Sequence, residues 1–333
     1  MIIRLTASCN NHCFFCMVEE EISRAAFRPL AEIVAEIDQA GAEEVIDIFG
    51  GEPTIDPVFW EVLAYAIDTG RQVTLATNAR LFAHRPSAER LSDIGLGRLL
   101  VRTSLMGPTA DLHDRLNGVK RSAFEQTIRG IRNLAQLGFC VQTNIVIFAE
   151  NVDELLATAM VAFDAGSRQI KFSGAIRTSG FLESVAPPEV IRARLKSIVP
   201  LLRALGVSVK LEKLTPCLVP DFLDILNREC DPSSESDGWF AKVDVCTRCS
   251  LVTTCPGAEK GMLRRFGEGW VEPISAIAER LIEEVEVASL GAYQPKKDKP
   301  FVRVRFPETT IGTLEALVNV AEFAARNPQV YLI

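Results

Sequence analysis

The sequence predicts an α/β protein whose first half is a parallel β-sheet covered by helices. Short apolar runs typical of buried strands alternate with stretches in which apolar residues recur at helical spacing. This alternation repeats about six times within about 180 residues, and polar residues follow the ends of the predicted strands. These observations favour a partial (β/α)6 barrel, in which ligands bind at the carboxyl ends of the strands.

The individual elements follow from these local patterns. Helices are predicted over 30–37 and 59–67 from apolar residues spaced by three and four. A helix over 188–205 and a strand over 207–211 lead out of the barrel, and a C-terminal α+β tail has a helix over 274–285 and a strand, helix, strand pattern over 301–333. Strands of the barrel are predicted at 1–5, 45–49, 72–76, 99–103, 141–147 and 169–172.

Three cysteines on one short segment after the first strand dominate the functional analysis. Cys9, Cys13 and Cys16 are spaced by three and then two residues. Thiolates at this spacing hold three irons of a [4Fe–4S] cube and leave the fourth iron without a protein ligand. A disulfide set is not expected, because no signal peptide precedes the cysteines. A structural zinc site needs four ligands, and His12 is unsuitably spaced to be the fourth.

The C-x3-C-x2-C pattern close behind a first strand resembles the radical SAM superfamily. The resemblance implies that Phe15, before the last cysteine, lies against the adenine of S-adenosylmethionine (SAM). The segment Gly50-Gly51-Glu52, directly after the second strand, is similar to the family's Gly-Gly-Glu signature. Glycines there let the backbone approach the methionyl group of SAM, and the Glu52 carboxylate accepts hydrogen bonds from its ammonium.

The resemblance covers about 175 residues of this half and implies further SAM contacts. Positions matching Thr77, Asn78, Ser104 and Asn144 lie near the methionyl carboxylate or the ribose in proteins of this type. Each residue also has a plain structural interpretation. Thr77 and Asn78 are suited to capping a helix, Ser104 to beginning a turn, and Asn144 to a hydrogen bond within the sheet.

A second group of cysteines lies in the C-terminal half. Cys246, Cys249 and Cys255 resemble the C-x2-C-x5-C core of the SPASM and twitch domains, which hold auxiliary iron–sulfur clusters. Cys217 is the expected fourth ligand, with Cys230 as its substitute. The full SPASM pattern has seven cysteines for two clusters, and five are present here, so one second [4Fe–4S] cluster is expected. A structural zinc site with four thiolates remains the alternative.

The predicted organisation has three parts. Residues 1–180 form the radical SAM partial barrel, and residues 181–273 form a bridging helix and strand followed by a small twitch-like auxiliary-cluster domain. Residues 274–333 form a C-terminal α/β extension for substrate binding or dimerisation. Cys140 lies in the apolar run 137–141 and is expected to be buried as a small hydrophobe.

Charge and hydropathy exclude two classes of partner. The formal net charge is −7 and the chain has no basic run, so nucleic acid binding is not expected. No apolar stretch approaches the about 18 residues that would span a bilayer, so membrane insertion is not expected either. A cytoplasmic location is expected, in keeping with cysteines held reduced for metal binding.

The resemblance implies an enzyme that reductively cleaves SAM and uses the 5′-deoxyadenosyl radical to abstract hydrogen, with electrons from a flavodoxin- or ferredoxin-like donor. A peptide or protein is the preferred substrate, for cross-linking, epimerisation or oxidation. Because Cys9 lies near the start, no leader-binding domain is expected before the barrel. Dehydrogenation or rearrangement of a small metabolite, such as a sugar or aminocyclitol, is the alternative. A non-catalytic zinc or iron–sulfur scaffold is the alternative of another class.

Overall fold

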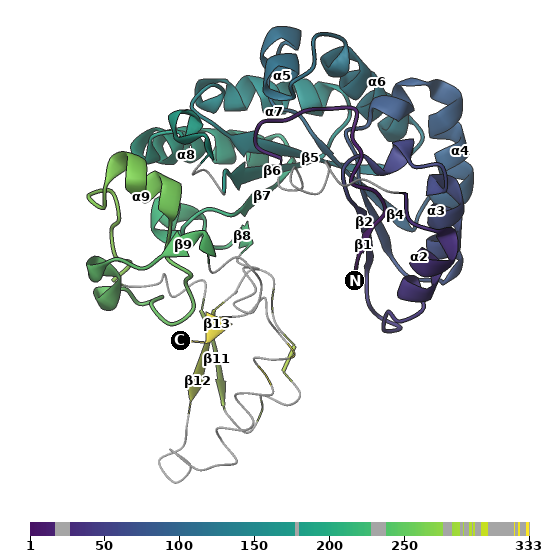
Figure 1. The fold of residues 1–333 in the computed structure, drawn as a ribbon. Helices are drawn as coiled ribbons and strands as arrows, with labels where there is room; N and C mark the ends of the chain where they lie inside the picture. Colours follow the sequence, from purple (N-terminus) through teal and green to yellow (C-terminus); the bar gives the residue numbers. More distant parts are fainter. Residues whose placement is uncertain are drawn as a thin grey trace. The chain divides into compact units, whose positions relative to one another are not determined.

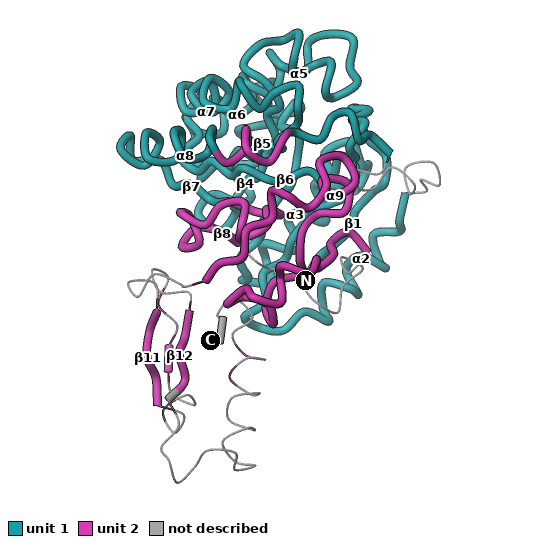
Figure 2. Tube along the Cα trace, turned by 90° about the vertical axis from the view of Figure 1, so that its left-hand side faces the viewer, with its two compact units in different colours: residues 1–186, 193–210 teal, residues 187–192, 211–333 magenta. Residues whose placement is uncertain are grey.

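The structure is a computed structural model, and it describes most of the first 275 residues together with short pieces of the tail. The chain divides into two compact units (Figure 2). Unit 1 comprises residues 1–186 and 193–210, and unit 2 comprises residues 187–192 and 211–333. The described residues are 1–16, 27–176, 180–227, 238–275, 282–286, 289, 293–294, 296, 301–305, 323, 326 and 331–332.

Unit 1 contains a parallel β-sheet whose strands are neighbours in chain order (Figure 1). Strand β7 (Ser208–Glu212) begins beside β6, where the Ser208 N–H donates to the Arg168 carbonyl at 3.0 Å. The predicted parallel sheet is therefore confirmed. The first six strands are β1 (Ile2–Arg4), β2 (Ile46–Phe49), β3 (Val73–Ala76), β4 (Leu99–Ser104), β5 (Cys140–Ile147) and β6 (Gln169–Gly174).

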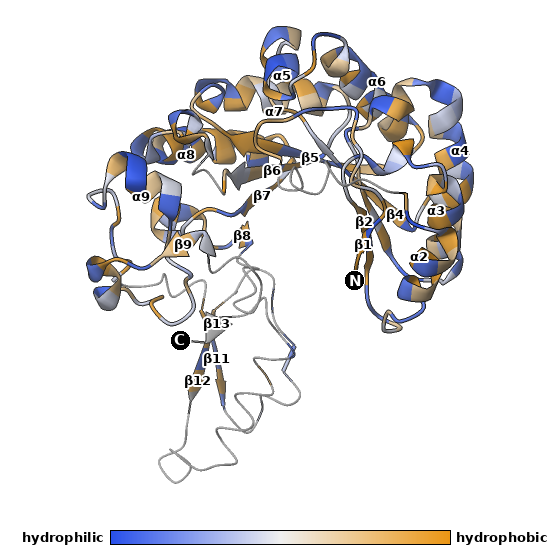
Figure 3. Cartoon of the chain, viewed as in Figure 1, coloured by the Kyte–Doolittle hydropathy of each residue, from blue (hydrophilic) through white to orange (hydrophobic). Residues whose placement is uncertain are grey.

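Helices cover one face of this sheet, and the strands alternate between buried and partly exposed residues. Ile48, Leu75 and Phe59 are fully buried in the core between the two layers. Each such side chain contributes about 1.5–3 kcal/mol to folding. Figure 3 shows apolar colour along the strands and both colours on the helices. The helices are α2 (Leu30–Ile37), α3 (Phe59–Asp68), α4 (Arg85–Gly95), α5 (Ala110–Leu116), α6 (Ala123–Gln136), α7 (Leu155–Asp164) and α8 (Pro188–Ala204).

Unit 2 is built from short strands and loops. The end of β7 pairs in parallel with β8 (Leu226–Asn227). Strands β9 (Phe240–Ala241) and β10 (Ala258–Glu259) form an antiparallel pair, followed by α9 (Lys260–Phe266). A separate parallel sheet contains β11 (Ile282–Glu286), β12 (Phe301–Arg305) and β13 (Tyr331–Leu332). Across the described parts of the chain, no helix combines the length and apolarity needed to cross a membrane.

Two local expectations are corrected. Residues 282–285 belong to strand β11 and not to the end of a helix, because pairing with β12 overrides the helical spacing of Ile282 and Val285. Cys140 is exposed at the first position of β5, because strand alternation places Val141 on the buried side and Cys140 beside Gln169. The three-part division of the chain, with boundaries at 180 and 273, stays a prediction.

Candidate functional site

The segment that carries the first three cysteines continues the pairing of β1 with β2. The Leu5 N–H donates to the Phe49 carbonyl at 2.9 Å. Beyond the strand ends, the Gly51 N–H donates to the Thr6 carbonyl at 2.7 Å and the Glu52 N–H donates to the Ser8 carbonyl at 2.8 Å. The Gly-Gly-Glu turn therefore lies directly against the backbone that leads into Cys9.

The two glycines of this turn are required by that close approach. A Cβ atom on Gly50, whose φ is +153°, would lie 2.2 Å from the Thr6 carbonyl oxygen. A Cβ atom on Gly51 would lie 2.2 Å from the Ser8 carbonyl oxygen. Real side chains do not tolerate such distances to backbone. The glycines thus allow the turn to pack directly against the backbone of residues 6–8. Their approach to the methionyl group of SAM stays a prediction.

Glu52 is buried at the centre of the turn, with 1% of its surface exposed. Its Oε1 atom accepts hydrogen bonds from the Thr54 hydroxyl at 2.6 Å, the Thr54 N–H at 3.2 Å and the Thr77 hydroxyl at 2.6 Å. Its Oε2 atom accepts the Asn78 N–H at 2.6 Å. Burial raises the pKa of Glu52, although these hydrogen bonds act in the opposite direction. A carboxylate oxygen accepts at least two bonds, so Oε2 has capacity for a further donor.

Thr77 and Asn78 form the turn between β3 and the short 3-10 helix η2 (Arg80–Ala83). The Thr77 hydroxyl oxygen accepts the Ala79 N–H at 3.1 Å, and Asn78 Oδ1 accepts the Arg80 N–H at 3.0 Å. The Asn78 side-chain amide also donates to Asn10 Oδ1 at 2.6 Å. Both side chains therefore accept N–H groups within the turn, whereas the N-cap residue of η2 is Ala79, so neither Thr77 nor Asn78 caps this helix. Their contact with SAM stays a prediction.

The three thiols of the cysteine loop lie close enough to influence one another. The Cys9 sulfur accepts the Asn11 N–H at 3.4 Å, and the Cys13 thiol lies 3.2 Å from Asn117 Oδ1. Burial, with Cys9 and Cys16 nearby, raises the pKa of Cys13 to about 12. Burial also raises the pKa of Cys9, with further contributions from Glu52 and Cys16. Three thiolates here require positive charge among them, as a bound metal cluster provides.

An aromatic cluster stands beside these cysteines. The Phe15 ring lies 4.7 Å from the ring of Phe148, which directly follows β5. Phe14 contacts Phe148 and Phe181, with both centroid distances at 5.2 Å. Phe15 therefore forms part of an apolar wall next to the last cysteine of the loop. Such a wall suits stacking of a flat heterocycle such as adenine.

Ser104 and Asn144 lie opposite each other at the ends of the neighbouring strands β4 and β5. Asn144 Oδ1 accepts the Ser173 hydroxyl at 2.6 Å, and Ser173 lies near the end of β6. The structure thus brings the two predicted residues together and gives Asn144 the sheet hydrogen bond considered from sequence. Neither arrangement tests whether they contact SAM.

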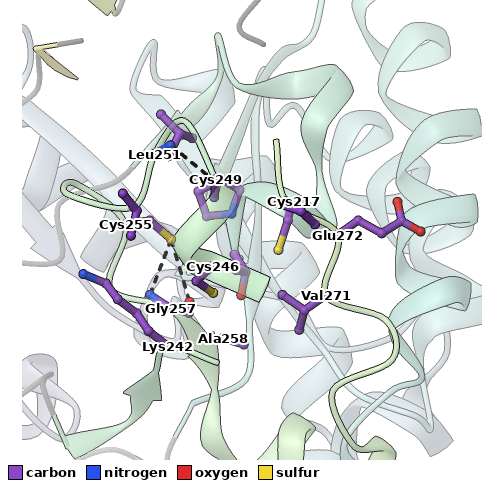
Figure 4. A pocket seen from close by; sticks show the side chains of 14 residues that line it. Cys217, Lys242, Cys246, Cys249, Leu251, Cys255, Gly257, Ala258, Val271 and Glu272 are labelled. Atoms are coloured by element: carbon purple, nitrogen blue, oxygen red, sulfur yellow. Dashed lines mark hydrogen bonds between the residues drawn. The ribbon is translucent and has the colours of Figure 1, made fainter. Parts of the chain in front are cut away.

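In unit 2, the second group of cysteines surrounds one pocket (Figure 4). Cys217 lies in the 3-10 helix η6 (Pro216–Leu218), and Cys246 lies in η9 (Asp244–Arg248). Cys249 and Cys255 complete the wall on the following segment. The empty space among them, including its open side, is about 390 Å³. The four thiols predicted as ligands are therefore brought together, whereas Cys230 lies outside the described residues.

Backbone donors point at two of these sulfurs. The Leu251 N–H donates to the Cys249 sulfur at 3.4 Å, and the Gly257 N–H donates to the Cys255 sulfur at 3.4 Å. N–H groups directed at sulfur tune the reduction potential of iron–sulfur clusters. The two loops therefore present backbone donors to sulfur atoms of the pocket.

Burial, together with the neighbouring cysteines of the pocket, raises the pKa of Cys217 to about 12. Four thiolates around one pocket are the donor set of a structural zinc ion and of a [4Fe–4S] cube alike, so the residues present fit either group.

Comparison with known proteins identifies the first half of the chain. Residues 3–162 match the model of the radical SAM superfamily. These residues include the cysteine loop, the Gly-Gly-Glu turn and the strands that position them. Residues 3–162 are a radical SAM domain.

Relatives of the radical SAM domain include an AdoMet-dependent heme synthase of Methanosarcina barkeri, 32% identical over 170 residues, which cover 49% of this chain and 46% of the relative. The mycofactocin maturase MftC of Mycobacterium tuberculosis is 31% identical over 167 residues, 49% of this chain and 41% of the relative. The chain thus spans less than half the length of these relatives. Streptococcus suis SuiB, solved with its precursor peptide SuiA, shares the fold with a TM-score of 0.55 at 16% identity, over 66% of this chain and 50% of SuiB.

One residue beside the cysteine loop was missed from sequence. Arg80 donates to residues of the loop. It belongs to no motif, and the signal available was its position two residues after Asn78 at a strand end. Asn117, directly after α5, lies in the stretch that resembles the family, but the sequence analysis gave it no role, and the structure places it against Cys13.

Proposed function

We propose that this protein is a radical SAM enzyme that modifies a peptide or protein. The observation that carries the proposal is the meeting of the three thiols of the cysteine loop with the Gly-Gly-Glu turn in the radical SAM domain. Cys9, Cys13 and Cys16 would hold a [4Fe–4S] cluster, which would supply the electron for cleaving SAM to methionine and a 5′-deoxyadenosyl radical.

The side chains around the loop have complementary tasks in this proposal. Glu52 Oε2 accepts a hydrogen bond from the ammonium of SAM, while Oε1 keeps its three internal donors. Phe15 provides the apolar surface for adenine, supported from behind by Phe148. The polar groups at the strand ends, Thr77, Asn78, Ser104 and Asn144, contact the methionyl carboxylate or the ribose. Together they orient SAM and keep water away from the reacting bond.

Anaerobic reconstitution with iron and sulfide tests the proposal directly. The reduced wild-type protein is expected to convert SAM to methionine and 5′-deoxyadenosine in equal amounts, as measured by chromatography. The same sample without reductant is the control and should give neither product. A fully loaded protein that leaves SAM intact under reduction would overturn the proposal.

SAM binding should depend on pH through Glu52. Burial raises the pKa of this carboxyl, so part of Glu52 stays protonated at pH values above the ordinary glutamate pKa of about 4.3. The ammonium of SAM favours the carboxylate, so binding releases a proton and affinity rises with pH up to the raised pKa. A Glu52→Gln variant should bind SAM more weakly and without this pH dependence, as measured by equilibrium dialysis. An identical pH profile in both proteins would contradict the assignment.

A peptide substrate is favoured by two of the comparisons. One relative is named a maturase, and a solved structure of the same fold holds a precursor peptide. The heme synthase, with similar identity, favours a small metabolite as the second candidate. Incubation with candidate substrates and deuterium tracing into 5′-deoxyadenosine separates the two. Label from a peptide supports the first, and label from a metabolite alone supports the second.

We further propose that Cys217, Cys246, Cys249 and Cys255 bind a second [4Fe–4S] cluster, with Cys230 as a substitute ligand. The shared pocket and the N–H donors to two sulfurs support a metal group held by thiolates, and the resemblance of the C-x2-C-x5-C core to auxiliary-cluster domains favours iron–sulfur over zinc. Such a cluster would offer a place for the substrate's electron after hydrogen abstraction, which would make the protein an oxidoreductase. A flavodoxin- or ferredoxin-like protein would donate the separate electron that SAM cleavage needs. This proposal places the enzyme in the cytoplasm.

Iron analysis of a Cys246→Ser/Cys249→Ser double variant tests the second cluster. The wild-type protein should hold about eight irons, and the variant about four, because the two remaining thiolates hold a cube too weakly. SAM cleavage should persist in the variant, since the cysteine loop of the radical SAM domain is intact. Cys140→Ser serves as the matched control and should keep all of the iron. Four irons and one zinc in the wild type would refute the assignment.

A further inference from the structure

We propose that Arg80 is a positioning residue that fixes the shape of the cysteine loop (residues 9–16). This inference rests on the proposed role of the loop as the ligand of a metal cluster. Its Nη1 atom donates to the Asn10 carbonyl at 2.7 Å and to Asn11 Oδ1 at 2.7 Å. Its Nε atom donates to Gln126 Oε1, on helix α6, at 2.7 Å. One side chain therefore ties the residues between the first two cysteines to the helical layer of unit 1.

The connection continues from Arg80 to a cluster ligand. Arg80 holds the oxygen of the Asn11 side chain, so its amide nitrogen faces Asn117 and donates to Asn117 Oδ1 at 3.3 Å. That same oxygen accepts the Cys13 S–H at 3.2 Å, a bond that the ionised, metal-bound form of Cys13 no longer makes, so in the loaded protein the link between Asn117 and the loop is the backbone one. The Asn117 carbonyl also accepts the His12 N–H at 2.9 Å. Asn11 and Asn117 are 7% and 4% exposed, so water cannot replace these partners and the orientation of each amide is set by the next.

Arg80 is itself held in place by helix α6. The preceding residue, Ala79, has a left-handed backbone with φ of 61°, which directs the chain into η2. A Cβ atom on Gly130 of α6 would lie 2.1 Å from the Ala79 carbonyl oxygen. In addition, the Thr127 hydroxyl donates to the Asn78 carbonyl at 3.0 Å. The glycine thus permits a close approach that fixes the turn carrying Arg80.

Arginine suits this task better than other donors. Its guanidinium is a rigid, planar fork that is always protonated and accepts no hydrogen bonds, so it fixes several acceptors in one geometry. The loop needs such support because residues 10–13 have no regular secondary structure to set the direction of their side chains. Partners of this kind orient metal ligands, and removing them typically weakens metal binding or activity about 10- to 100-fold.

Four variants test the proposal in the reconstituted protein. Arg80→Gln should lose iron to a chelator about 10- to 100-fold faster from the cysteine loop and should show a weakened change in its electron paramagnetic resonance spectrum on adding SAM. Arg80→Lys should recover part of the iron retention and part of the spectral response to SAM, because an ammonium still reaches Asn10 and Asn11. Gly130→Ala should resemble Arg80→Gln even though alanine favours helix formation. Arg85→Gln, near η2 but bound to Glu89, should match the wild type.

These readouts separate this inference from the proposed function. Iron retention and the resonance spectrum are measured without turnover, so they remain informative even if the wild type fails to cleave SAM. Arg80→Gln and Gly130→Ala proteins that retain iron and respond to SAM as the wild type does would overturn the inference. Equal losses in Arg85→Gln would also overturn it, because the effect would then not depend on contact with the loop.

Discussion

A Cys16→Ala variant is expected to form no 5′-deoxyadenosine while keeping about four irons in unit 2. The loss is expected because the two remaining thiolates hold a [4Fe–4S] cube too weakly. Cys16 is also the loop cysteine closest in sequence to the aromatic wall formed by Phe15 and Phe148. The loss should be complete rather than partial, because no other cysteine of the radical SAM domain is placed to substitute. Chromatography of the reduced reaction and iron analysis provide the two measurements.

Cys140→Ala is the matched control for this loss. Cys140 belongs to the same unit but lies exposed at the start of β5, hydrogen bonded to Gln169. Its removal should leave both product and iron unchanged. Equal product from Cys16→Ala and the wild type would remove the radical mechanism, since SAM would then be cleaved without the cluster.

The strands of the radical SAM domain were predictable because their signal is local. In β2, β3 and β4 buried and partly exposed residues alternate, and the apolar runs end where polar residues begin. In the tail the local pattern was misleading. Ile282 and Val285 have helical spacing, yet pairing with the distant residues 301–305 places them in a strand.

The same distinction separates the predictable and unpredictable parts of the site. The cysteine spacing and the Gly-Gly-Glu turn are each contained in a few residues, so a motif reveals them. The contact between Arg80 and Asn11 joins residues 69 positions apart, and that between Cys13 and Asn117 joins residues 104 apart. Such pairs meet only because parallel strands bring their carboxyl ends together.

The glycines illustrate a motif whose physical reason was only partly visible. From sequence, Gly50 and Gly51 were interpreted by their approach to SAM. The structure adds a contact within the chain itself, since the missing side chains leave room for the carbonyls of Thr6 and Ser8. One turn thereby fixes the path of the cysteine loop as well as the location of Glu52.

Gly51→Ala is therefore expected to lower SAM cleavage by about 100-fold or more. The new Cβ would meet the Ser8 oxygen at 2.2 Å and the Ala7 oxygen at 2.5 Å, so the backbone before Cys9 must move by about 1 Å. Overpacking of this kind also costs about 1–3 kcal/mol of stability. The rate of 5′-deoxyadenosine formation and thermal unfolding of the reconstituted protein measure the two effects.

Gly41→Ala makes the same chemical change where space is available, because its Cβ would come no closer than 3.9 Å to Glu44. It should keep the wild-type rate, which separates the effect of the contact from that of losing a glycine. Were Gly51→Ala to cleave SAM as fast as Gly41→Ala, the backbone of residues 6–8 would have to yield without moving Cys9. The turn would then bind SAM without also setting the position of the cysteine loop. Only a rigid contact between the turn and residues 6–8 makes the added methyl group displace the cysteines.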